Sequence, residues 1–131
     1  MHDTRRPVSI GYTADPGEQD TLTHEVQHDA TVEKLVPRFY AGCETTVEVN
    51  IYVVSSGDAT KLVETVGKDH LDGENDEWTF RPSEPVEKGD EIMIQFENTD
   101  SENPHRFRVN FELDREGGKM RSILSLLGVS T

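Results

Sequence analysis

The stretch VEKGDEIMIQFENTDSENPHRFRVNFELD, residues 86–114, contains the clearest structural signal in the sequence. In residues 91–98, and again in residues 105–114, apolar side chains alternate with polar ones. The apolar set is Ile92, Ile94, Phe96, Phe107, Val109, Phe111 and Leu113. Alternation of period two places one face of each segment in a core and the other in water, as in antiparallel strands. The stretch therefore predicts two such strands in succession.

Turn-forming residues bracket these two segments. Lys88, Gly89 and Asp90 predict a tight turn into the first strand. Residues 98–104 are polar and predict a hairpin loop, after which His105 opens the return strand.

Further strands follow from the same pattern elsewhere in the chain. Residues 45–54, TTVEVNIYVV, alternate strongly, and five weaker candidates are residues 9–13, 22–27, 31–40, 62–66 and 77–81. Pro37 lacks a backbone donor, so we expect an edge strand or a bulge there. About seven to eight short strands with regular turns predict an all-β antiparallel sandwich, either a jelly roll or an Ig/cupredoxin-like fold.

The chain of 131 residues suits one domain. We expect residues 1–20 to be an N-terminal arm or first strand, residues 21–116 the sandwich, and residues 117–131 an apolar arm. In this arm Met120, Ile123, Leu124 and Leu127 recur at helical spacing. So short a helix cannot stand alone in water. It would dock on its own sandwich or on a neighbouring subunit, which makes the four residues candidate assembly contacts.

The charge balance limits the possible partners. Asp and Glu number 26 against 13 Lys and Arg, which gives a net charge of −13. Such a surface repels phosphate backbones, so we expect no nucleic-acid partner. It also suits high salt, where self-repulsion is screened. No apolar run is long enough for a membrane span, and no N-terminal signal peptide is recognisable, so export by the general secretory route is not expected.

The segment VEKGDEIMIQFEN, followed by Pro104 and His105, resembles a strand pair of the cupredoxins, whose pattern is V-x-x-G-D-x-V-x-F-x-N and then P-H. In that family the histidine is a copper ligand. A type-1 copper centre also needs a thiolate and a second imidazole. No cysteine or histidine follows His105, Met120 stands alone, and Cys43 lies far upstream. We therefore expect the strand pair without the copper site.

Other candidate ligands are weaker. Cys43 is the only cysteine, so it forms no internal disulfide, and we expect it to be a small buried apolar residue. His24 and His28 lie four residues apart, about 13 Å on a strand, which is too far for one metal ion.

An acidic turn surrounds His70. Asp69, Asp72, Glu74 and Asp76 supply hard oxygen ligands but lack the spacing of a calcium hand. They are weak candidates for Ca²⁺ or Mg²⁺, and the alternative is a solvated acidic turn. The polar loop of residues 98–103 is a still weaker candidate. No other cofactor is expected.

We expect no enzyme, because the sequence has no nucleophile elbow, no H-E-x-x-H motif and no glycine-rich phosphate loop. The aromatic residues Tyr40, Tyr52, Trp78 and Phe80 could form a sugar-stacking platform, although such residues more often pack in a core. Trp78 and Phe80 alternate with polar residues, so we expect both rings to face inward.

The acidic strand-and-turn sequence of residues 41–114, including AGCETTVEVNIYVV and PVEKGDEIMIQFENTD, resembles small structural proteins of viruses of halophilic archaea. The resemblance implies self-assembly, stability in high salt and a virion location. A compact chain suits a capsid decoration or turret protein, which would form homo-oligomers and bind other virion proteins. The alternative is a binding module that recognises a glycan or a cell-surface partner.

Overall fold

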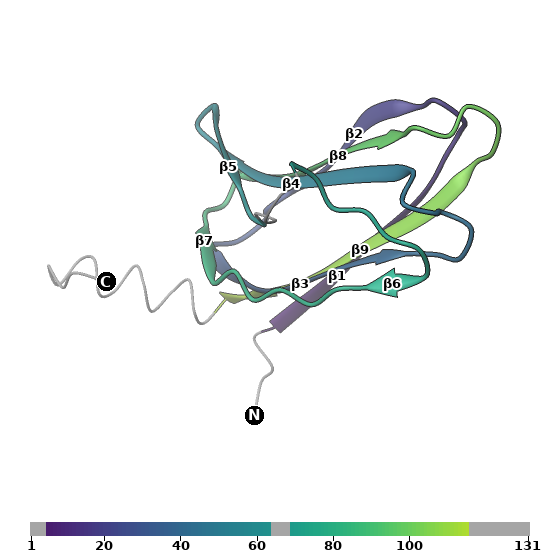
Figure 1. Cartoon of the computed structure of the whole chain (residues 1–131). Coiled ribbons are helices and arrows are strands. Elements are labelled where there is room, and N and C mark those ends of the chain that lie inside the picture. The colour runs from purple at the N-terminus through teal and green to yellow at the C-terminus, as the bar shows by residue number, and fades with distance from the viewer. Residues whose placement is uncertain (1–4, 64–68, 116–131) are drawn as a thin grey trace, which may run out of the picture.

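The computed structural model describes residues 5–63 and 69–115, which form two antiparallel sheets packed face to face (Figure 1). Sheet A, the lower layer in Figure 1, contains β1 (Arg5–Ala14), β9 (His105–Asp114), β3 (Ala30–Phe39), β6 (Asp76–Glu77) and β7 (Glu84–Val86). Sheet B, the upper layer, contains β2 (Gln19–Glu25), β8 (Glu91–Asn98), β4 (Val47–Ser55) and β5 (Asp58–Lys61). The prediction of an all-β antiparallel sandwich is confirmed.

The strand order distinguishes between the expected sandwich types. Sheet A runs β1-β9-β3-β6, with β7 also paired to β3, and sheet B runs β2-β8-β4-β5. Successive strands β1 and β2, β3 and β4, and β8 and β9 lie in opposite sheets. This order is that of a jelly roll, in which paired strands wrap together around the core.

The core lies between the sheets and follows the period-two pattern. All seven apolar residues of the β8 and β9 alternation are at most 7% exposed. Residues of β3 and β4 face them, with Leu35 and Ile51 at most 1% exposed. Because every second residue points inward, the intervening polar residues form the outer face of each sheet.

Most of the segment expected as a strand at residues 62–66 lies outside the described ranges, and the pattern missed the strand that precedes it. The partner of β4 is β5, which begins four residues earlier at Asp58, and residues 64–68 lie outside the described ranges. The reason is the turn: Ser56 and Gly57 both adopt positive φ, 50° and 85°, as a two-residue hairpin turn requires. The strand therefore starts directly after Gly57, although Asp58 is a poor strand former.

Pro37 lies in β3, which pairs with β9 along one side. Its other side is flanked only intermittently, by β6, β7 and a bridge between Leu35 and Phe80. Leu35 donates to Phe80 on that side, so Pro37, two residues later, directs its nitrogen the same way. The missing donor thus falls on the interrupted side, and the bulge of β3 lies nearer its start, between Val32 and Lys34.

The two ends of the chain differ in how much of them the structure describes. β1 pairs with β9 over its whole length, so residues 5–14 of the expected arm or first strand form a strand at the edge of sheet A. Residues 117–131, with Met120, Ile123, Leu124 and Leu127, lie outside the described ranges. Within those ranges, no helix is long and apolar enough to cross a membrane.

Candidate functional site

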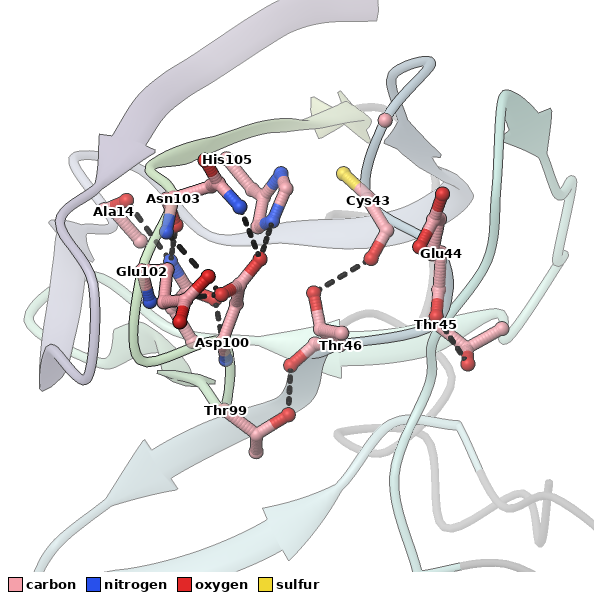
Figure 2. Close-up of polar contacts among 12 residues, drawn as sticks. Ala14, Cys43, Glu44, Thr45, Thr46, Thr99, Asp100, Glu102, Asn103 and His105 are labelled. Carbon is pink, nitrogen blue, oxygen red and sulfur yellow. Dashed lines mark hydrogen bonds and ion pairs between the residues drawn. The ribbon is translucent and has the colours of Figure 1, made fainter.

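His105 closes the loop between β8 and β9 (Figure 2). Its Nε2 lies 2.8 Å from Oδ2 of Asp100. The same carboxylate accepts from the backbone of Glu102 and of Asn103. The backbone N–H of Glu102 and then the bond to His105 hold the pKa of Asp100 well below its usual range. His105, which the sequence pattern compared with a copper ligand, therefore makes a structural contact in this loop.

Asn98 joins that loop to the loop between β1 and β2. The side chain is fully buried, and its Nδ2 donates to the carbonyl groups of Ala14, Asp15 and Asn103. Its Oδ1 accepts from the backbone N–H of Asp100. We call this set of contacts, made by Asn98, Asp100 and His105, the loop clasp.

Cys43 lies beside the loop clasp and is 1% exposed, as expected for a small buried residue. Burial raises the pKa of its thiol, so it is a poor nucleophile. Its Sγ lies 3.4 Å from the carbonyl oxygen of Arg106. The Cys43 carbonyl accepts from Thr46, whose own carbonyl accepts from Thr99 of the β8–β9 loop, as Figure 2 shows.

The carboxylates of the acidic turn point to different partners. Asp69 and Asp72 contact the two ring nitrogens of His70 at 2.8 and 3.0 Å. Glu74 instead accepts from the backbone of Gly42 and Glu44, and Asp76 accepts from the backbone of Glu74. Within the described residues, no three His, Cys, Asp or Glu side chains are grouped to hold a metal ion.

His70 is surrounded by carboxylates. Burial lowers its pKa, but the bonds to Asp69 and Asp72, together with the charge of Glu48, outweigh burial and raise the pKa above its usual value. Glu48 Oε1 lies 3.1 Å from Nδ1 of the ring. The imidazole therefore fixes the acidic turn against β4.

The remaining candidates are dispersed. His24 packs edge-on against the ring of Phe111 at 5.5 Å. Phe80 packs against the core, as expected, but the inward placement expected for Trp78 is wrong, because this side chain is 46% exposed. It follows the two-residue strand β6 at the margin of sheet A, where no neighbouring strand covers it. Tyr40 and Tyr52 lie on different sheets, so the four aromatic residues form no common platform.

A cluster of arginines on the outer face of sheet A was not expected from the sequence. Arg38 and Arg106 each place Cζ 4.9 Å from the centre of the Tyr40 ring. Arg108 donates from Nε to the Tyr40 hydroxyl at 3.3 Å, and from Nη1 to Ser9 Oγ at 2.6 Å. We call the surface formed by Arg38, Tyr40, Arg106 and Arg108 the arginine face.

The arginine face gathers three positive charges beside one carboxylate, that of Glu77, which is the other cross-strand partner of Arg38. Arg38 and Arg108 are directly opposite cross-strand partners, an arrangement that like charges destabilise. None of the three arginines forms an ion pair with a described carboxylate. The bond from Arg108 is the main reason that the pKa of Tyr40 is lowered.

The outer face of sheet B has the opposite character. Glu48 is the cross-strand partner of Glu97, and Glu25 is the partner of Glu91. Apart from the contact between His70 and Glu48, these four side chains have no described cationic partner. We call this surface, defined by Glu25, Glu48, Glu91 and Glu97, the glutamate face.

A hollow of about 350 Å³ opens on the glutamate face. Glu48 and Glu97 line it, together with Asp20, Asn50, Asp69 and His70, whose ring already contacts Glu48 and Asp69. The Oδ1 atom of Asn50 is buried without a hydrogen-bond partner among the described residues. The hollow therefore offers several acceptors and could hold a cationic group.

Neither face could be predicted from the sequence, because each brings together residues that are far apart in the chain. Arg106 and Arg108 alternate with Phe107, which does place them outward. That Arg38 lies beside them follows only from the register between β3 and β9. The same holds for Glu48 and Glu97, which the register between β4 and β8 brings together.

No protein-family model and no curated protein sequence matches the chain. In fold it is similar to the Yersinia pseudotuberculosis-derived mitogen, with a TM-score of 0.47 and 7% identity over 81% of this chain and 84% of that one. It is also similar to the periplasmic inhibitor of g-type lysozyme from Aeromonas hydrophila, with a TM-score of 0.42 and 10% sequence identity. That match covers 86% of this chain and 90% of the inhibitor. VP2 of infectious bursal disease virus is similar in fold with a TM-score of 0.43 and 13% sequence identity, over 88% of this chain and 34% of the VP2 chain. Such likeness concerns the fold alone.

Proposed function

We propose that the protein is a non-enzymatic structural subunit of a halophilic virus particle, a capsid decoration or turret protein that acts by self-association and docking. The observation that carries this proposal is the arginine face. On a chain of net charge −13, three arginines gather on one face without a described ion-pair partner. A docked protein surface would supply the missing carboxylates.

The composition of the face supports protein docking. Arginine and tyrosine are enriched at protein interfaces and in their hot spots. Tyrosine makes large contacts with little loss of side-chain freedom, and arginine presents several donors in a planar fork. The ring of Tyr40 holds two guanidinium groups in place before any partner arrives. Preorganisation of this kind lowers the entropic cost of association.

The halophilic virus setting rests on the acidic composition and on the resemblance described above. Acidic surfaces tolerate molar salt because their self-repulsion is screened. Jelly rolls occur in viral capsid domains and in lectin domains, so the fold suits both the structural role and its alternative and decides neither.

Light scattering of the purified protein in molar salt tests the proposal. We expect a closed oligomer, such as a trimer or pentamer, which would occupy a symmetric position in a particle. A monomer at every protein concentration would contradict self-association.

The alternative is a binding module that recognises a glycan or a cell-surface partner, and the exposure of Trp78 favours it. An indole that is 46% exposed at a sheet margin is available for stacking on a sugar ring. We expect red-shifted fluorescence that a soluble quencher reduces. If this role is correct, a bound glycan would shield Trp78 from the quencher, whereas self-association through the arginine face would leave quenching unchanged.

A further inference from the structure

The arginine face and the hollow of the glutamate face lie at the same end of the sandwich, on opposite outer surfaces. Arg106 follows the first residue of β9, and Glu97 is the last residue but one of β8. The loop of residues 99–104 connects these two strands. Each copy of the chain therefore carries a cationic surface on one side of this end and an anionic hollow on the other.

We propose that the arginine face of one copy binds the hollow of the glutamate face of a second copy, with Arg106 entering the hollow. This inference rests on the proposed function, since it names the partner and the surfaces through which the subunits associate. The occupant is a second copy because the chain itself presents the complementary charge.

Arg106 is the most available of the three guanidinium groups. Arg108 is engaged by Tyr40 and Ser9, and Arg38 donates to Asn75 Oδ1 at 3.4 Å. Arg106 is exposed and lies over the Tyr40 ring, and no hydrogen bond from its guanidinium to a described residue accompanies that stacking. As far as the described residues go, its five N–H donors can bind acceptors in a fixed, planar geometry.

The hollow contains hydrogen-bond acceptors for the guanidinium group of Arg106. The carboxylates of Glu97 and Asp20 line it, and each can accept charge-assisted hydrogen bonds. A guanidinium in the hollow would also separate the negative charges of Glu48 and Glu97, which face each other across the strands.

The contact would be heterologous, because different surfaces of the two copies meet. Such contacts repeat from copy to copy and close into a ring when the rotation between copies permits, or continue as a stack. In molar salt the screening length is only about 3 Å, so attraction at a distance is lost. Hydrogen bonds between Arg106 and the carboxylates act at shorter range and are retained.

Charge reversal on each surface tests the pairing. The variants are Arg106→Glu and Glu97→Arg, compared with the wild type by light scattering and sedimentation in molar salt. Arg81→Glu and Glu87→Arg are the matched controls, because they change the net charge equally at exposed positions outside both faces. We expect each test variant to associate about a hundredfold more weakly or worse, since like charges then face each other, and each control to associate as the wild type does.

Mixing the two test variants provides the decisive measurement. An equimolar mixture of Arg106→Glu and Glu97→Arg contains two complementary pairs of surfaces, so association should return to near the wild-type level. Loss of association in both variants without recovery in the mixture would overturn the pairing. Unchanged association in either variant would overturn these surfaces but leave the proposed structural role intact. A monomeric wild type would overturn both.

Discussion

Tyr12 and Tyr40 lie at the same end of sheet A but on opposite faces and in opposite electrostatic surroundings. Tyr12 is the cross-strand partner of the buried Phe107, and its hydroxyl donates to Glu18 Oε2 at 2.5 Å. That bond, with burial and the Glu18 charge, raises the pKa of Tyr12 to about 12. The Tyr40 hydroxyl instead accepts from Arg108, which lowers the pKa of Tyr40.

The difference separates two uses of polar side chains. Around Tyr12 and the loop clasp, donors meet acceptors of the same chain, so the polar groups stabilise the fold. On the arginine face, guanidinium donors outnumber the acceptors that the described residues provide. Polar groups that are balanced internally indicate structure, whereas an excess of one kind on the surface indicates a binding role.

The largest expected effect is loss of stability on breaking the loop clasp by Asn98→Ala. We expect the free energy of unfolding to fall by about 3 kcal/mol, since several buried backbone groups lose a partner that is worth roughly 1 kcal/mol each. Denaturant titration in molar salt measures it. Asn110→Ala is the control, because its buried Oδ1 has no hydrogen-bond partner among the described residues to lose. Equal losses in the two variants would contradict the distinction between internally balanced and unbalanced groups.

The two tyrosines should ionise at opposite ends of an alkaline titration. We expect Tyr40 to ionise below the ordinary value of about 10 and Tyr12 at about 12. Tyr40→Phe should remove the earliest rise in tyrosinate absorbance, and Arg108→Met should move it to higher pH. Arg81→Met serves as the control. If Tyr12 ionised before Tyr40, the assigned surroundings would be wrong.

The loop clasp should weaken in acid. The pKa of Asp100 is lowered in the folded protein, so its charge contributes stability above the ordinary carboxyl value of about 4. That contribution is lost as the pH falls through the lowered pKa. The difference in unfolding free energy between the wild type and Asp100→Asn should therefore be constant above about pH 4 and shrink below it. A difference that stayed constant down to about pH 2 would contradict the role of the Asp100 charge.

The smallest expected effect is relief of repulsion on the glutamate face. Glu91→Gln removes one of the two opposed charges of the Glu25–Glu91 pair. We expect the unfolding free energy of the monomer to rise by about 0.2–1 kcal/mol at low salt, and the gain to vanish in molar salt. Glu87→Gln is the control, because it removes one negative charge at a position outside both faces. A gain of the same size in Glu87→Gln would mean that the effect is general.

Much of the fold could be predicted because it depends on local alternation. Residues 91–98 and 105–114 were identified with their ends, since Gly89 and the polar hairpin loop mark where each strand starts. The turn residue Gly89 adopts a φ of 94°, a conformation that favours glycine. Strands with weak alternation were less predictable: β5 is exposed and β6 has two residues, so neither leaves a period-two pattern.

The candidate sites were predicted less well. The burial of Cys43 and the position of His105 at the start of β9 were expected, and both are confirmed. Trp78 was placed inward because alternation gives the direction of a side chain but not whether anything covers it. The acidic turn shows a similar limit, since its spacing did not reveal that His70 and the backbone near Gly42 would engage its carboxylates.

The sequence by itself determined the all-β class, the core residues of the strongest strands and the acidic character of the surface. These properties depend on residue type and short-range periodicity, which a single strand displays without its neighbours. The tertiary structure decided the jelly-roll order and the two charged faces. Arg38 meets Arg108, and Glu48 meets Glu97, only through the register of strands distant in the chain. Register depends on the packing of the whole core, so no local pattern could specify which charges would lie side by side.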